Sequence, residues 1–189
     1  MARRSDHSRE ELMELAICKG VEIIDKAGLY RFSARQAARD MGYTVGTLYH
    51  VFGNLDGYML HINGRILDEW HGQLSAGLKR NKGKDPLRYL VQAYIDFARQ
   101  EPYRWQALFE LRVEDNLPEW YGDKLARLFA LVEDAIRPHV GAAAARREAK
   151  VLWAGIHGIC VLSLTGKLDA VGAEKPETLA AALLEKFTV

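Results

Sequence analysis

Residues 33–52 read Ser33-Ala-Arg-Gln-Ala-Ala-Arg-Asp-Met-Gly-Tyr-Thr-Val-Gly-Thr-Leu-Tyr-His-Val-Phe52, two short helical patterns with a glycine between them. Ser33 and Thr44 each stand where a side-chain oxygen caps the first turn of a helix. Gly42 stands where the chain leaves the first helix, a position that favours positive φ. Leu48 and Phe52 are four residues apart and predict an inward face for the second helix. Together these features predict a helix-turn-helix and indicate a duplex DNA partner.

The outward side chains of this segment are the candidate contacts to DNA. Arg35 and Arg39, four residues apart on the first helix, are expected near the phosphate backbone, because guanidinium groups bind phosphates. Tyr49 is expected to hold phosphate as well, whereas the side chains near base edges come from the rest of the second helix. The predicted DNA-binding residues are Arg35, Arg39, Thr44, Val45, Thr47, Tyr49 and His50.

The segment resembles the DNA-binding domain of the TetR (tetracycline-repressor) family of bacterial transcriptional regulators, over about Leu12 to Met59. The resemblance is strongest from Gly42 to Phe52, which fits the family pattern Gly-x-Ser/Thr-x-Gly-Thr-Leu-Tyr-x-x-Phe. Two positions differ from the family: Val51 replaces a usual His, and Leu55 replaces a usual Lys. Both usual residues lie at or near phosphate contacts in that family.

Overall charge does not indicate a nucleic-acid partner. The 189-residue chain has a formal net charge of +1, and residues 1–60 carry eight Lys and Arg against eight Asp and Glu. Any DNA affinity must therefore come from the local placement of a few cations. Cys18 and Cys160 are far apart and give neither a disulfide framework nor metal-ligand spacing, which is typical of a reducing cytoplasm.

Helical periodicity continues along the rest of the chain and predicts an all-α fold with about nine helices. The longest is expected over residues 55–80, on the order of 39 Å, which is enough to join two domains. We therefore expect a three-helix DNA-binding domain at residues 1–55 and a helical ligand-binding and dimerisation domain at residues 56–189.

The run from Trp153 to Gly158 resembles the Trp-x-x-x-His-Gly motif of the WHG-type C-terminal domain found in part of the TetR family. The helix that carries this run is apolar on two sides, which favours burial by its own domain on one side and by a partner subunit on the other. The expected dimer interface combines this helix with the last helix of the chain. Its residues are Gly155, Ile159, Leu162, Leu179, Leu183 and Phe187.

Aromatic side chains of the C-terminal part are candidates for an effector pocket. Each of them has an ordinary alternative as a core residue, and His157 is either a satisfied core histidine or the polar anchor of an apolar pocket. A small hydrophobic effector would suit such a set. The predicted pocket residues are Trp105, Phe109, Trp120, Trp153, His157 and Cys160.

Other function classes lack a signature. The sequence shows no catalytic motif, no metal site and no cofactor-binding loop, and its longest apolar run, Val151 to Leu164, is too short to span a bilayer. The resemblance implies a cytoplasmic homodimer that represses transcription from an inverted-repeat operator and is released by a hydrophobic effector. The alternative, suggested by Val51 and Leu55, is a ligand-binding helical dimer with weak or lost DNA affinity.

Overall fold

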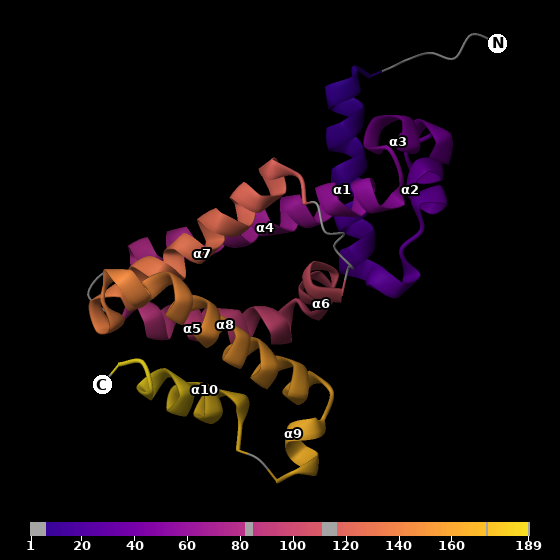
Figure 1. Cartoon of the computed structure of the whole chain (residues 1–189). Helices are drawn as coiled ribbons and strands as arrows, with labels where there is room; N and C mark the ends of the chain where they lie inside the picture. Colours follow the sequence, from indigo (N-terminus) through magenta and orange to yellow (C-terminus); the bar gives the residue numbers. More distant parts are fainter. Residues whose placement is uncertain (1–6, 82–84, 111–116, 173, 189) are drawn as a thin grey trace, which may run out of the picture. The chain divides into compact units, whose positions relative to one another are not determined.

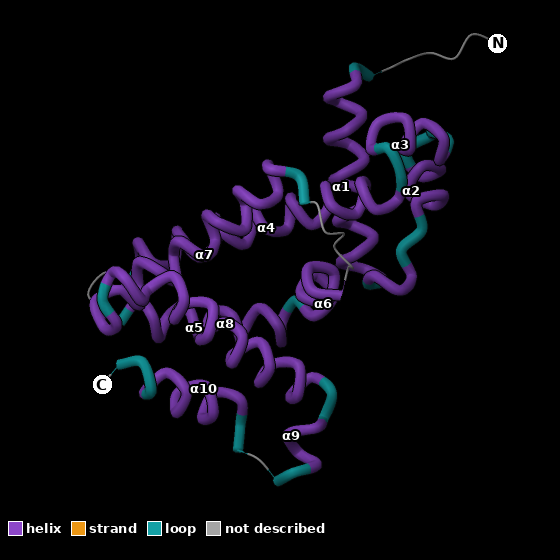
Figure 2. The backbone as a smooth tube through the Cα atoms, in the orientation of Figure 1, coloured by secondary structure: helices purple, strands orange, loops and turns teal. Residues whose placement is uncertain are grey.

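A computed structural model describes residues 7–81, 85–110, 117–172 and 174–188. Over these ranges the chain consists of helices and loops, without a strand (Figure 2). The elements of this described part are α1 (Arg9–Ala27), the 3₁₀ helix η1 (Leu29–Arg31), α2 (Ala34–Asp40), α3 (Val45–Phe52), α4 (Leu55–Arg80), α5 (Pro86–Gln100), α6 (Pro102–Glu110), α7 (Glu119–Val140), α8 (Ala142–Leu164), α9 (Lys167–Ala170) and α10 (Pro176–Glu185). The predicted all-α fold class is confirmed.

The long helix predicted over residues 55–80 is α4, with the same limits. The described ranges contain ten α-helices rather than about nine. The shortest of them, α9, has four residues, and a single turn is too short for hydrophobic periodicity to reveal.

The chain divides into two compact units, which are described separately. Unit 1 comprises residues 1–69 and 103–121, so it contains α1 to α3, the first half of α4, nearly all of α6 and the first turn of α7. Unit 2 comprises residues 70–102 and 122–189. Packing alone does not test where a functional domain ends, so the division after residue 55 stays a prediction.

Unit 1 is built where α1 crosses the first half of α4. Gly20 of α1 permits a close approach, because a Cβ atom at this position would lie 2.3 Å from Cδ1 of Ile62. Beside it, the buried Tyr58 hydroxyl donates a hydrogen bond to the carbonyl oxygen of Ala16 at 2.6 Å. Burial raises the pKa of Tyr58, so this phenol stays protonated and remains a donor. These contacts hold α1 against the first half of α4.

Unit 2 is built around α8, which packs against α10 and α5 (Figure 1). The side of α8 that faces its neighbours is a stripe at helical spacing: Ala145, Ala149, Leu152, Ile156 and Cys160. At Gly155 an added Cβ would lie 2.5 Å from Cδ2 of Leu183, so α10 approaches α8 closely there. Small residues along α8 thus set how near its neighbours come.

Candidate nucleic-acid interface and effector site

Two capped helices joined by a tight turn form the predicted helix-turn-helix of unit 1. The Ser33 hydroxyl accepts from the backbone N–H of Gln36, and the Thr44 hydroxyl accepts from that of Thr47, both at 3.3 Å. Between them Gly42 has φ +78°, the left-handed conformation that glycine adopts without steric cost. The N–H of Tyr43 then bonds the carbonyl of Ala38 at 2.8 Å, and that of Gly42 bonds the carbonyl of Arg39 at 2.9 Å. This is the Schellman arrangement, which closes a helix with its last carbonyls satisfied.

The faces of α3 agree with the predicted pattern. Leu48 and Phe52 are buried, whereas Tyr49 and His50 are exposed and Val45 and Thr47 are half-buried. On α2 both Arg35 and Arg39 are exposed, and Arg39 donates to the side chain of Gln36 at 2.5 Å. Thr44 is exposed at the start of α3. The seven candidates thus lie on one supersecondary motif with accessible side chains, while their contacts to DNA stay a prediction.

Two features of this surface escaped sequence reasoning. His7, just before α1, shares a 2.7 Å hydrogen bond between its Nδ1 and the hydroxyl of Tyr43 in the turn. Nothing in local spacing marks this pair, because 36 residues separate its members. At the end of α3, Gly53 has φ +83° and the side chain of Asn54 accepts from the N–H of Gly57 at 2.8 Å. The Gly53-Asn54 sequence is a recognisable stop-and-cap signal.

Three of the six predicted effector residues pack inside unit 1. Trp105 is buried in α6, with its ring centroid 5.2 Å from that of Phe109. Trp120, in the first turn of α7, stacks on His61 of α4 at a centroid distance of 4.6 Å, and His61 in turn meets Phe52 at 5.2 Å. An aromatic row therefore connects the end of α3 with the start of α7. The structure gives these residues core contacts.

The other three predicted effector residues lie in unit 2, where two of them meet. The Trp153 ring lies 5.6 Å from that of His157 and 5.4 Å from that of Phe129. The hydroxyl of Tyr94 and Nδ1 of His157 are 2.9 Å apart, at hydrogen-bonding distance. Burial lowers the pKa of His157, which favours its uncharged form. Tyr94 was not among the predicted pocket residues, because only its contact with the distant His157 brings it to this place.

Cys160 lies apart from this pair, in a groove of about 580 Å³ formed by α5, α8 and the start of α10. Burial raises the pKa of its thiol to about 11, so Cys160 is protonated and acts as a small apolar side chain. The polar rim of the groove includes the ion pair between Arg99 and Glu177, 2.8 Å. The arrangement provides no reactive thiolate.

The residues that the structure describes hold no group of three or more His, Cys, Asp or Glu side chains arranged to bind a metal ion. Within the same ranges, no helix is both long and apolar enough to cross a membrane.

Residues 87–187, more than half of the chain, match the family model described as "Tetracyclin repressor-like, C-terminal domain". The Trp153-to-Gly158 motif falls inside this range. The chain is 25% identical over 151 residues to the uncharacterized HTH-type transcriptional regulator YobS of Bacillus subtilis, covering 79% of this chain and 77% of the relative.

Solved structures with the same fold include a protein of unknown function from Rhodococcus sp. RHA1, with a TM-score of 0.74, 17% identity and coverage of 98% of this chain and 97% of that one. Another is the multidrug binding protein EbrR complexed with imidazole, with a TM-score of 0.62, 15% identity and coverage of 95% and 96%. At these identities the two structures support the fold alone. Together with the matched C-terminal domain and the helix-turn-helix, they lead to one assignment: the chain belongs to the TetR family of helix-turn-helix transcriptional regulators.

Proposed function

We propose that this protein is a cytoplasmic homodimeric repressor that binds an inverted-repeat operator and is released by a small hydrophobic effector. The observation that carries the proposal is the capped α2–Gly42–α3 motif, whose second helix buries Leu48 and Phe52 and exposes Tyr49 and His50. A helix of this length fits a major groove. Two copies related by a two-fold axis read half-sites about 34 Å, one helical turn, apart.

Within this proposal Arg35, Arg39 and Tyr49 bind phosphate, and Val45, Thr47 and His50 read base edges and thymine methyl groups. Thr44 caps α3 and presents its start to the backbone of the DNA. Arg35 and Arg39 are exposed, which supports their assignment as phosphate contacts. A side chain that binds only phosphate adds affinity for every sequence, whereas one that reads a base adds affinity for one sequence.

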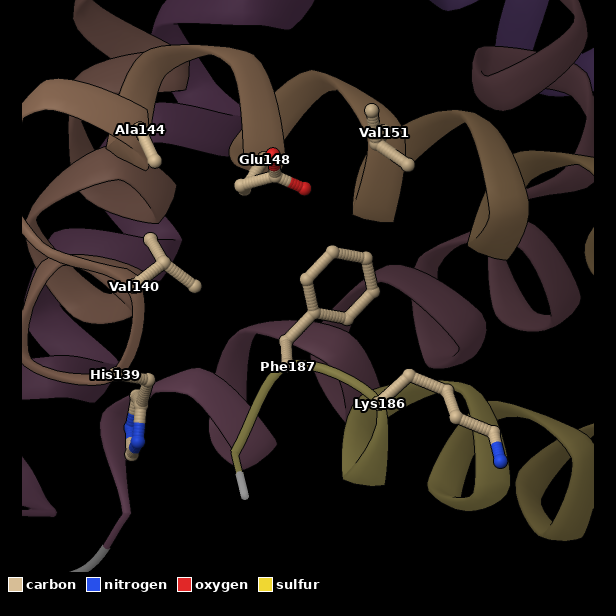
Figure 3. Close-up of a pocket in the computed structure, with 7 residues that line it drawn as sticks. All are labelled: His139, Val140, Ala144, Glu148, Val151, Lys186 and Phe187. Carbon is tan, nitrogen blue, oxygen red and sulfur yellow. The ribbon is translucent and has the colours of Figure 1, made fainter.

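A dimer interface on α8 is supported by two exposed apolar side chains. Val151 and Leu162 are 50% and 41% exposed, and their separation of three helical turns places them on the same face. Beside Val151 lies a notch of about 400 Å³ lined by His139, Val140, Ala144, Glu148, Val151, Lys186 and Phe187, with the Phe187 ring pointing toward Glu148 and Val151 (Figure 3). We propose that the partner subunit covers this face. Of the predicted interface, Gly155 and Leu183 already contact each other within one chain.

The effector site is proposed in unit 2 at Trp153, His157 and Cys160, with Tyr94 added through its hydrogen bond to His157. Trp153 and His157 support this most directly, since they meet beside a small apolar cavity of unit 2. Effector and DNA are coupled only if the effector binds the two conformations of the dimer with different affinity. A tenfold loss of DNA affinity requires about 1.4 kcal/mol of such coupling.

The test is selection of bound sequences from random duplex DNA, followed by salt titration of the selected site. Replacing Arg35 with Ala should weaken all sequences alike and reduce the salt slope by about one unit. The matched control is Arg88→Ala, which removes an exposed arginine of unit 2 outside the proposed dimer face and should leave the slope unchanged. Absence of any selected sequence at low salt would contradict operator binding.

The dimer is tested with Leu162→Glu, which would bury a carboxylate in the proposed interface and should give monomers in sedimentation. Leu164→Glu is the control, because Leu164 is similarly exposed, 44%, but points to the other side of α8. If the Leu162→Glu variant is still a dimer, the interface lies elsewhere on the protein.

The second candidate function, a ligand-binding dimer with weak or lost DNA affinity, is favoured by Leu55. This residue opens α4 with a 42% exposed apolar side chain where the family usually places a lysine. Replacement of Leu55 by Lys should strengthen DNA binding and steepen the salt slope by about one unit if the position faces phosphate. An unchanged slope would remove Leu55 as a reason for weak binding.

A further inference from the structure

The turn of the helix-turn-helix carries a tyrosine that is bonded to a histidine from outside the motif. Nδ1 of His7, the residue before the cap of α1, lies 2.7 Å from the hydroxyl oxygen of Tyr43. The two ring centroids are 6.1 Å apart and the ring planes are inclined at 54°, so the rings are not stacked and the polar atoms make the contact. This hydrogen bond gives the Tyr43 hydroxyl a defined position at the surface of unit 1.

His7 also interacts with the capping box at the start of α1. The Glu11 carboxylate accepts from the backbone N–H of Ser8 at 2.7 Å, and the Ser8 hydroxyl accepts from the N–H of Glu11 at 3.1 Å. The hydrogen bonds from Ser8 lower the pKa of Glu11, with a smaller contribution from His7, so His7 lies within electrostatic reach of this carboxylate. A histidine that interacts with both a carboxylate and a phenol is restricted in its orientation.

Tyr43 stands directly before the recognition helix. Thr44 caps α3, and the first residues of a recognition helix are the ones that approach base edges in the major groove. The backbone N–H of Tyr43 bonds the carbonyl of Ala38 at 2.8 Å, which ties the turn to α2. The side chain is half-buried, and its hydrogen bond with His7 is exposed. A polar group at this point of the motif lies at the rim of the groove, where the phosphates run.

The chemistry of the pair suits a phosphate acceptor. A tyrosine hydroxyl can donate one hydrogen bond and accept others. When Nδ1 of His7 carries a hydrogen and donates to the tyrosine oxygen, the hydroxyl hydrogen can be donated to a further acceptor. Both the imidazolium ion and one neutral tautomer of histidine provide this hydrogen. A phosphate oxygen is charged, so a hydrogen bond to it is stronger than one between neutral groups.

We propose that Tyr43 is a further DNA contact of this protein, donating through its hydroxyl to a backbone phosphate, and that His7 is the positioning residue that orients this hydroxyl. The proposal rests on the DNA binding of the proposed function and adds to it a contact from the turn between α2 and α3. Because the contact is made to phosphate, it adds affinity for every duplex sequence.

The first test is Tyr43→Phe, which removes the hydroxyl and keeps the ring. Binding to the selected operator and to an unrelated duplex should weaken alike, by about tenfold, while the salt slope stays unchanged because the phenol is uncharged. Tyr30→Phe is the matched control, since Tyr30 lies in η1, beyond the other end of α1, and is 83% exposed. It should bind as the parent protein does. Unaltered binding by Tyr43→Phe would overturn the proposal.

Methylphosphonate substitution of one phosphate at a time distinguishes a direct contact from a structural role. At one position in each half-site the substitution should weaken the parent protein and bring its affinity within about twofold of that of Tyr43→Phe, because two changes to one interaction are not additive. If the variant is weaker than the parent by the same factor at every position, the hydroxyl acts only on the structure of the turn and the proposal fails.

Variants of His7 test the positioning role. His7→Ala should weaken binding as much as Tyr43→Phe does, and the double variant should be no weaker than either single one. His7→Asn keeps a nitrogen donor near the place of Nδ1 and should retain most of the affinity. Additive losses in the double variant, or full affinity in His7→Ala, would remove His7 from the proposal.

The same measurements separate this proposal from the repressor proposal. If an operator is selected and Tyr43→Phe binds it as the parent does, the repressor proposal stands and the Tyr43 contact fails. If no operator is selected but an unrelated duplex is bound at low salt and Tyr43→Phe weakens that binding, the phosphate contact stands and operator recognition fails. If no duplex is bound, both proposals fail.

Discussion

The two units each contain an arginine that binds two carboxylates, and the two arginines differ in burial. In unit 1, Arg104 bonds both carboxylate oxygens of Asp25, at 2.6 and 2.8 Å, and Glu69 at 2.9 Å, with its side chain 19% exposed. In unit 2, Arg99 bonds Asp96 at 2.7 Å and Glu177 at 2.8 Å, and is 59% exposed. The carboxylates of the two pairings are about equally exposed, so the difference lies in the arginine, and Arg104 also joins three helices, α1, α4 and α6.

Other contacts repeat this difference. Unit 1 has buried hydrogen bonds between helices, such as the Asn63 amide to the carbonyl of Ala107 at 2.7 Å, and a bidentate pair between Arg65 and Glu14 at 2.6 and 2.7 Å. Unit 2 relies more on close apolar packing, as between Gly155 and Leu183. Directional contacts specify one arrangement, whereas apolar packing tolerates repacking. We therefore expect unit 1 to tolerate less repacking than unit 2.

The largest effect is expected from two glycines of α4 that fall in different units. A Cβ at Gly57 would lie 2.1 Å from the backbone oxygen of Phe52, so Gly57→Ala must shift the α3–α4 turn and should reduce the free energy of unfolding by roughly 2 to 3 kcal/mol. At Gly72 nothing lies within 4 Å of the added atom, and Ala should stabilise the helix by about 1 kcal/mol. Chemical denaturation measures both.

Opposite signs for the two variants would support rigid packing in unit 1. Stabilisation by Gly57→Ala would show instead that this turn adjusts freely.

The next largest effect on stability is expected from Arg104 and Arg99. Arg104→Ala removes three charge-assisted hydrogen bonds from an arginine that is 19% exposed, and it should lower the free energy of unfolding by about 1.5 kcal/mol. Arg99→Ala should lower it by less than about 1 kcal/mol, because ion pairs of an exposed arginine are screened by solvent. Denaturant midpoints at low and high salt measure the difference. Equal losses in the two variants would remove the proposed contrast between the units.

The smallest effect concerns pH and His157 in unit 2. Because burial lowers the pKa of His157, the unfolded chain takes up this proton more readily than the folded protein. Its contribution to stability is therefore complete above the pKa of an unfolded histidine, about 6.5, and is lost progressively as pH falls below it. Unfolding free energies of the protein and its His157→Gln variant, measured from pH 7.5 to 5, should converge toward acid pH. A difference independent of pH would contradict the prediction.

Sequence reasoning succeeded where a structural decision depends on neighbouring residues. The caps at Ser33 and Thr44, the turn at Gly42, the inward side chains Leu48 and Phe52 and the limits of α4 all follow from spacings of a few residues, since caps and helical faces repeat within one turn. For the same reason the family pattern of this segment is recognisable in the amino-acid sequence alone.

The sequence by itself thus determined the all-α class, the helix-turn-helix and the family, because these depend on local helix signals and on a short motif. Only the tertiary structure decided which distant residues meet: His7 with Tyr43, Tyr94 with His157, and Trp120 with His61. Hydrophobic patterning predicts that a side chain is buried, but it does not predict which residues that side chain contacts, because the hydrophobic effect is non-directional. The partners are selected when helices far apart in sequence pack together, and that is why the helix-turn-helix was predictable and the contacts between distant aromatic side chains were not.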